Sequence, residues 1–129
     1  MRLFIASADK TLRLALLLLL LESEPGLVVI GMSDRPKGLL TVVGTSQPDV
    51  VLLDDGLARQ ATGQLVSDLH YLEFHPKIIV LSTKPQALAT TLAACADGFI
   101  SKSMPPDELL PLLRSMRLSD LEPIRKRVA

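Results

Sequence analysis

Short apolar runs alternate with longer stretches of mixed character along the whole chain. Each run has the length of a buried β-strand, and most of the stretches between runs are long enough for a helix. The expected strands are residues 3–6, 27–32, 50–53, 77–81 and 98–100. The expected helices are residues 10–22, 34–45, 62–72, 85–94 and a last one that starts near Pro106. The pattern therefore predicts strands and helices in strict alternation.

Strands that are apolar throughout are typical of a parallel sheet that helices cover on both faces. Because crossovers between parallel strands are right-handed, the predicted fold class is α/β, with a doubly wound, five-stranded parallel sheet. Residues 1–118 are expected to form this one domain, and residues 119–129 a linker or the frayed end of the last helix. In such sheets, functional side chains gather at the carboxyl ends of the strands.

The helix expected at residues 10–22 carries leucine on two opposite faces. One face has Leu12, Leu16, Leu19 and Leu20, and the other has Leu14, Leu17, Leu18 and Leu21. A surface helix normally has polar residues on its second face. We therefore expect the first face to pack on the sheet and the second to be buried in a homodimer, beside the last helix.

Composition narrows the functional classes. Lys and Arg number 14, as do Asp and Glu, so the formal net charge is zero and gives no basic footprint for nucleic acid. The leucine run is too short to span a membrane, and Glu22 and Glu24 follow it where a signal peptide would have small residues. The single cysteine, Cys95, favours an intracellular chain. These features predict a cytoplasmic domain without membrane contact.

Polar side chains follow four of the expected strands. Asp9 follows the first strand, Asp54 and Asp55 the third, Ser82 the fourth and Lys102 the fifth. Because the strands are expected to be parallel, these side chains would meet at one edge of the sheet. A carboxylate can accept a phosphoryl group, a lysine ammonium can pair with phosphate oxygens, and a hydroxyl can donate a further hydrogen bond to them.

Four segments carry a family resemblance: residues 48–54 (PDVVLLD), 78–82 (IIVLS), 96–102 (ADGFISK) and 106–110 (PDELL). In this order and at this spacing they resemble the receiver domains of response regulators, most closely those of the LuxR/NarL type. The resemblance implies a flavodoxin-like (βα)5 fold and a signalling module rather than an enzyme. It also implies that Asp54 is the phospho-acceptor position, Ser82 the switch hydroxyl, Phe99 the switch aromatic and Lys102 the phosphate-binding lysine.

The family pattern has an acidic pair after the first strand, which holds Mg²⁺ together with the acceptor. Here Ser7 and Ala8 stand at those positions, and Asp9 comes one place late. Because Mg²⁺ needs near-octahedral oxygen geometry, Asp54 with an offset Asp9 makes a poor site. The prediction is therefore an atypical receiver domain of a transcriptional response regulator. It would act in dimerisation and protein interaction, with weak or absent phosphorylation and no cofactor, and would contact DNA only through a domain outside these residues.

Two alternatives stay open. In the first, Asp9 and Asp54 bind Mg²⁺, with Asp55 or a backbone carbonyl completing the site, and a histidine kinase phosphorylates Asp54. The phosphorylated residue would then draw Ser82 inward, and Phe99 would follow. In the second, the chain is a small flavodoxin-like enzyme, although residues 7–10 (SADK) stand where such a protein would carry a glycine-rich phosphate loop.

Overall fold

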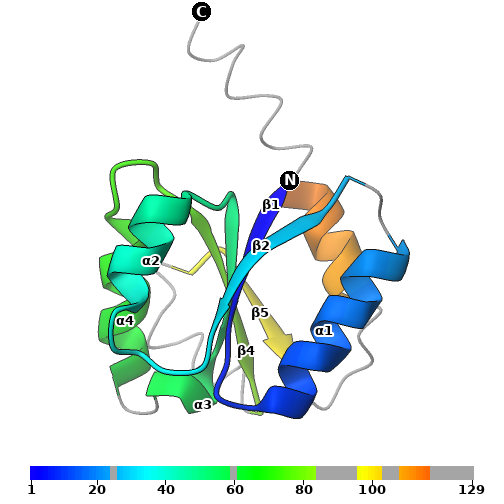
Figure 1. Ribbon diagram of the computed structural model, residues 1–129, viewed down its shortest axis with the longest axis horizontal. Helices are drawn as coiled ribbons and strands as arrows, with labels where there is room; N and C mark the ends of the chain where they lie inside the picture. The colour runs from blue at the N-terminus through cyan, green and yellow to red at the C-terminus, as the bar shows by residue number, and fades with distance from the viewer. Residues whose placement is uncertain (24–25, 59–60, 84–95, 103–107, 117–129) are drawn as a thin grey trace, which may run out of the picture.

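The fold is a parallel sheet between two layers of helices (Figure 1). The computed structural model describes residues 1–23, 26–58, 61–83, 96–102 and 108–116. All neighbouring strands are parallel, in the order β2-β1-β3-β4-β5. The strands are β1 (Arg2–Ala6), β2 (Val28–Ser33), β3 (Val50–Asp54), β4 (Lys77–Ser82) and β5 (Gly98–Ser101). The predicted fold class is confirmed, and the predicted strand limits differ from these by at most one residue at each end.

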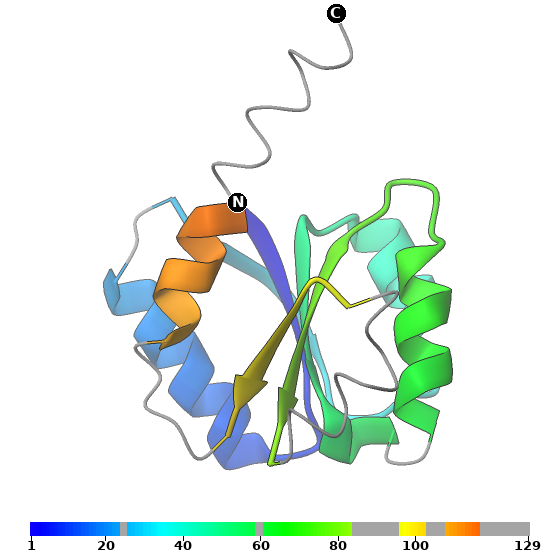
Figure 2. The ribbon, with the colours of Figure 1, turned by 180° about the vertical axis from the view of Figure 1, so that it is seen from behind.

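The helices divide between the two faces of the sheet. α1 (Lys10–Ser23) lies beside the helix at residues 109–116 on one face, and α2 (Leu39–Ser46) and α4 (Thr62–His70) cover the other (Figures 1 and 2). A short helix, α3 (Asp55–Ala58), follows β3 directly. The predicted helix at residues 85–94, Cys95 and the segment 119–129 lie outside the described residues.

The core consists of one hydrophobic cluster on each face of the sheet. Side chains of β1 alternate between them: Ile5 packs on the α1 side, and Phe4 packs on the side of α2 and α4. β3 is buried along its whole length. Each large side chain buried in this way contributes about 1.5–3 kcal/mol. The packing therefore fixes where β1, β3 and β4 end, and these ends carry the polar residues of interest.

β2 departs from the expectation that helices cover every strand on both faces. It pairs only with β1 and forms an edge of the sheet. Val28 and Met32 of this strand are exposed. An apolar run therefore predicted the strand correctly but could not show that it lies at an edge.

The first leucine face of α1 packs on the sheet, as predicted. Leu16 and Leu20 are buried, and Leu12 and Leu19 pack partly against the same cluster. On the opposite face, Leu14, Leu18 and Leu21 are exposed by 46%, 58% and 66%, and Leu17 is half-buried. Within the described residues, no helix is both long and apolar enough to cross a membrane.

The prediction for α2 is wrong at its start. The expected helix began at Asp34, but α2 begins at Leu39. Gly38 precedes it with a φ of 79°, a left-handed conformation that glycine adopts readily and that a right-handed helix cannot include. Residues 34–38 therefore form a bend and a turn rather than the first turn of the helix.

Candidate functional site

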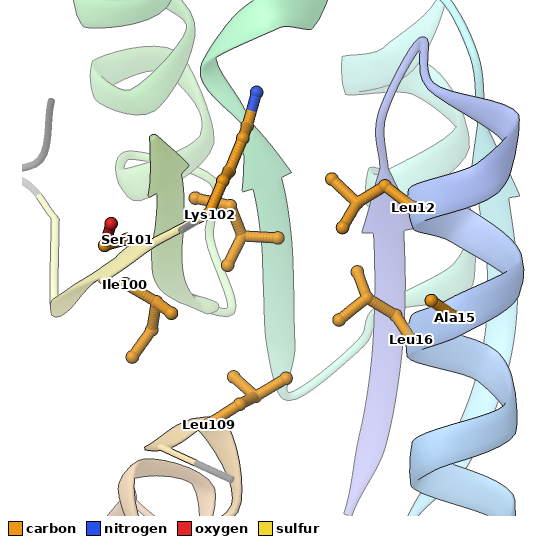
Figure 3. Close-up of a pocket in the computed structure, with 8 residues that line it drawn as sticks. Leu12, Ala15, Leu16, Ile100, Ser101, Lys102 and Leu109 are labelled. Atoms are coloured by element: carbon orange, nitrogen blue, oxygen red, sulfur yellow. The ribbon is translucent and has the colours of Figure 1, made fainter. Parts of the chain in front are cut away.

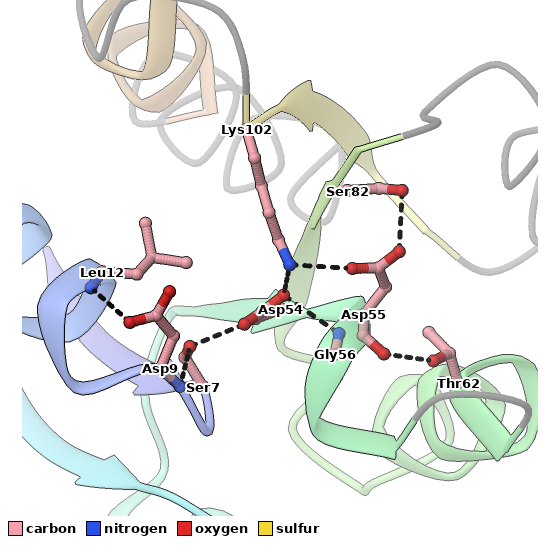
Figure 4. A network of polar contacts seen from close by, with 9 residues as sticks. All are labelled: Ser7, Asp9, Leu12, Asp54, Asp55, Gly56, Thr62, Ser82 and Lys102. Carbon is pink, nitrogen blue, oxygen red and sulfur yellow. Dashed lines mark hydrogen bonds and ion pairs between the residues drawn. The ribbon is translucent and has the colours of Figure 1, made fainter.

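The carboxyl ends of four strands bring a polar cluster together (Figure 4). Asp54 is the last residue of β3 and Ser82 the last of β4, while Ser7 follows β1 and Lys102 follows β5. Because the strands are parallel and in register, their ends meet at one edge of the sheet. The predicted convergence of Asp54, Ser82 and Lys102 at this edge is what the structure shows.

Asp54 is a buried carboxylate with three partners. Its side chain is 2% exposed and forms an ion pair through Oδ1 with the Lys102 ammonium. The Ser7 hydroxyl donates to Oδ2 at 2.7 Å, and the Gly56 backbone N–H donates to Oδ1 at 3.0 Å. Burial alone would raise the pKa of Asp54. The hydrogen bonds from Lys102, Ser7 and Gly56, with the Lys102 charge, outweigh burial and hold that pKa below its usual value.

Asp55 binds both the Lys102 ammonium and the Ser82 hydroxyl. Its Oδ1 lies 3.0 Å from the Lys102 Nζ, and its Oδ2 accepts a hydrogen bond of 2.8 Å from the Ser82 hydroxyl. Lys102 therefore bridges both carboxylates. Partial burial would lower the pKa of Lys102, but the hydrogen bonds and negative charges of Asp54 and Asp55 raise it above its ordinary value.

Asp9 lies apart from this cluster. Its Oδ1 accepts the backbone N–H groups of Thr11 at 3.0 Å and Leu12 at 3.2 Å, so it caps α1 from an exposed position. In Figure 4 its carboxylate points towards the helix rather than towards Asp54. Of the two acids predicted to surround Asp54, the structure thus brings Asp55 to the site and leaves Asp9 on the helix.

Ser7 is a site residue whose role the sequence did not reveal. In the sequence it stood out only as the residue in place of an acid. The structure gives its fully buried hydroxyl two roles: it donates to Asp54, and it accepts the Asp9 backbone N–H at 3.1 Å. The signal that could have found it is its place directly after β1, which pairs with β3.

Phe99 lies on β5, opposite Val80 of β4. Its half-buried ring packs against the cluster on the side of α2 and α4. Its predicted role as the switch aromatic stays a prediction.

The side chains of this edge do not fit Mg²⁺. Asp54 and Asp55 are both paired with Lys102, whose positive charge opposes a cation at the same place. Ser7 offers a hydroxyl in place of a carboxylate, and the Asp9 carboxylate caps α1. Among the described residues, no group of three or more His, Cys, Asp or Glu side chains is placed to hold a metal ion.

An apolar pocket of about 80 Å³ lies below Lys102, between α1, β4, β5 and the helix at residues 109–116. Figure 3 shows Leu12, Leu16, Ile100 and Leu109 around it, while the Lys102 side chain extends away from it. A cavity that binds benzene has about 150 Å³. As formed by the described residues, the pocket is too small for an organic ligand of that size.

Comparison with known proteins identifies the family. A model of the response regulator receiver domain matches residues 4–114. The chain belongs to this family. Receiver domains are signalling modules of two-component response regulators, which interact with kinases, phosphatases and other regulators, and some of them dimerise. A search of curated proteins found no match to the sequence.

Solved structures show the same receiver fold. A LuxR-family response regulator from Aurantimonas sp. SI85-9A1 is 18% identical with a TM-score of 0.80, over 99% of this chain and 98% of its own. A LuxR-family DNA-binding response regulator from Staphylococcus aureus is 18% identical with a TM-score of 0.77, over 89% and 97%. RcsB from Salmonella enterica serovar Typhimurium, bound to a promoter in the presence of phosphomimetic BeF3⁻, is 20% identical with a TM-score of 0.78. That match covers 91% of this receiver domain and 60% of RcsB.

Proposed function

We infer that this receiver domain is atypical and signals through protein interaction and dimerisation, with weak or absent phosphorylation of Asp54. One observation carries the inference: the Ser7 hydroxyl, rather than a carboxylate, lies 2.7 Å from Asp54. Asp9, the acid two residues after Ser7, is held on α1 by two backbone N–H groups. Of the two acids expected near Asp54, Asp55 therefore remains to attract a divalent cation, and it is paired with Lys102.

The charges of the site oppose phosphoryl transfer to Asp54. An incoming phosphoryl group adds negative charge beside two carboxylates, and enzymes neutralise such charge with metal ions or cationic side chains. In the described site, Lys102 supplies the cation, and it is already bound to both Asp54 and Asp55. Asp54 is also almost inaccessible, with 2% of its side chain exposed. These features support a receiver that does not depend on phosphorylation.

We expect the protein to resist chemical phosphorylation. After incubation with acetyl phosphate and millimolar Mg²⁺, intact-mass spectrometry should show no phosphoryl adduct. Beryllofluoride should leave the amide NMR signals around Asp54 in place. A stoichiometric adduct on Asp54, or saturable shifts centred on it, would support the alternative of a working phospho-acceptor that a histidine kinase switches.

Replacing Ser7 by an acid should make the free energy of unfolding depend on Mg²⁺. Ser7→Asp places a second carboxylate beside Asp54 in a buried site, so without metal we expect a loss of about 1–3 kcal/mol in unfolding free energy. Mg²⁺ at a concentration a hundred times its Kd would raise the unfolding free energy of this variant by about 2.7 kcal/mol. Thermal unfolding with and without Mg²⁺ measures both effects.

Ser7→Asn is the matched control, because it has the same shape as Asp without the charge. Neither this variant nor the unchanged protein should gain stability with Mg²⁺. An equal Mg²⁺-dependent rise in Tm for all three proteins would show that the natural site already binds the ion, against the proposal.

The exposed leucine face of α1 gives the proposed interface. Leu14, Leu18 and Leu21 are exposed on one face of the helix, and Leu17 lies half-buried beside them. The helix at residues 109–116 packs next to α1 and shares its buried hydrophobic cluster. An apolar patch of this kind on a helix favours association, and its self-complementary partner would be a second copy of the chain. As a two-component signalling module, the dimer would work in the cytoplasm.

A further inference from the structure

The Asp55 carboxylate connects side chains at the ends of two neighbouring strands. Its two oxygens are shared between Ser82, which donates to Oδ2 at 2.8 Å, and Lys102, whose Nζ lies 3.0 Å from Oδ1 (Figure 4). Ser82 ends β4, and Lys102 follows β5. A single carboxylate from the start of α3 thus joins the ends of both strands.

The surroundings make these two contacts strong. The Ser82 side chain is fully buried, and a buried hydroxyl needs a hydrogen-bond partner. The side chains of Lys102 and Asp55 are only 23% and 24% exposed, so solvent screens their ion pair less than it would screen a surface pair. The Asp55 backbone is also held, because the Thr62 hydroxyl donates to its carbonyl oxygen at 3.3 Å. Asp55 is therefore fixed relative to α4 as well as to the strands.

Any phosphate-like group on Asp54 would need the donors that Asp55 now uses. A serine hydroxyl has one proton to donate, and that of Ser82 is directed to Asp55. The Lys102 ammonium already serves both carboxylates. The Asp55 carboxylate, an anion with two acceptor oxygens, thus occupies the same donors that phosphoryl oxygens would take.

We propose that Asp55 is a positioning residue: a built-in anion that holds the Ser82 hydroxyl and the Lys102 ammonium in place of a phosphoryl group. This inference rests on the proposed function, since a receiver that uses phosphorylation must release both donors. The β4–β5 register pairs Ser82 with Ser101 and Val80 with Phe99. The contacts of Asp55 with Ser82 and Lys102 therefore also fix the strand that carries Phe99. The site keeps one arrangement without any modification.

NMR of the full chain, without metal or phosphate donor, tests the proposal. The readouts are the side-chain rotamer of Ser82, from its couplings, and the proton exchange rate of the Lys102 ammonium. In the unchanged protein we expect one Ser82 rotamer. In Asp55→Ala we expect rotamer averaging and about tenfold faster ammonium exchange, the factor that matches the loss of one charge-assisted hydrogen bond. Asp55→Glu, which keeps the charge, should restore slow exchange.

Asp34→Ala is the matched control, because it removes the same charge from an exposed carboxylate that pairs only with its neighbour Arg35 in the described structure. It should leave both readouts unchanged. Asp55→Asn, a smaller change in case the alanine variant does not fold, keeps an acceptor for Ser82 and loses the Lys102 ion pair. We expect it to retain the rotamer and to speed ammonium exchange.

The proposal is overturned if Ser82 and Lys102 behave alike in the unchanged protein and in both the Ala and Asn variants, or if Asp34→Ala produces the same changes. Because no phosphodonor is present, this result is independent of the phosphorylation test. A phosphorylated Asp54 would refute the proposed function even if the Asp55 contacts were found as described.

Discussion

Replacing Lys102 by methionine is expected to lower the free energy of unfolding by about 3 kcal/mol. The change keeps most of the side-chain length and removes the charge that balances Asp54. The Asp54 side chain is only 2% exposed, so in the variant it would be a buried carboxylate without a cationic partner. Breaking a buried ion pair costs about 3–5 kcal/mol. We take the lower end because the Lys102 side chain is 23% exposed. Urea unfolding of both proteins at neutral pH measures the difference.

The pH dependence of this difference has a definite sign. In the unchanged protein the pKa of Asp54 lies below its ordinary value, so its contribution to stability is present above that ordinary value and is lost as the pH falls through the folded-state pKa. Without Lys102, burial should raise the pKa of Asp54 instead. The variant should therefore regain stability relative to the unchanged protein as the pH is lowered from about 7 towards 4.

A second substitution separates loss of charge balance from loss of packing. Asp54→Asn in the Lys102→Met background removes the unbalanced charge, while the amide can still bond Ser7 and the Gly56 N–H. The double variant should recover most of the lost stability. Lys37→Met, at an exposed lysine, should cost less than about 0.5 kcal/mol. A double variant as unstable as Lys102→Met alone would show that the lysine acts through packing of its stem rather than through Asp54.

The sequence predicted the sheet better than the helices, for a physical reason. Uninterrupted apolar runs such as residues 50–53 (VVLL) are favourable when they are buried inside the sheet, so the strands were placed closely. Helix starts depend on single backbone conformations. Because Gly38 is left-handed, α2 begins only after it, at Leu39. The α3 helix, Asp55–Ala58, is too short to show a helical period in the sequence.

The site was predicted as far as strand ends alone determine it. Asp54, Ser82 and Lys102 had to meet, because parallel strands end at one edge. The role of Asp55 was not predictable from strand geometry, since successive side chains of a strand point to opposite faces. α3 begins at Asp55, and this change of backbone brings its carboxylate to the same lysine as Asp54. Asp9 was misplaced because the unpaired N–H groups of α1 compete for its carboxylate.

Replacing Leu18 and Leu21 by lysine is expected to convert a dimer into a monomer. These two are the most exposed leucines of α1, whereas Leu17 is half-buried and would disturb the fold if changed. Burying one leucine contributes about 1.5–3 kcal/mol before the costs of association. Two losses of this size, with two positive charges brought together across the interface, should weaken the dimer at least about 100-fold. Sedimentation velocity over a range of concentrations measures the change.

Val42→Lys is the matched control for this interface. Val42 is 46% exposed, as Leu14 is, but it lies on α2, across the sheet from α1. Its replacement adds the same charge and removes an exposed apolar side chain without touching the α1 face, so the dimer should persist. If the unchanged protein is monomeric at high micromolar concentration, the α1 interface is refuted. If Val42→Lys dissociates the dimer as strongly as the leucine variant, dissociation is not specific to the α1 face and the proposed interface loses its support. Dissociation by the leucine variant alone would place the surplus leucines of α1 in the contact between two receiver domains.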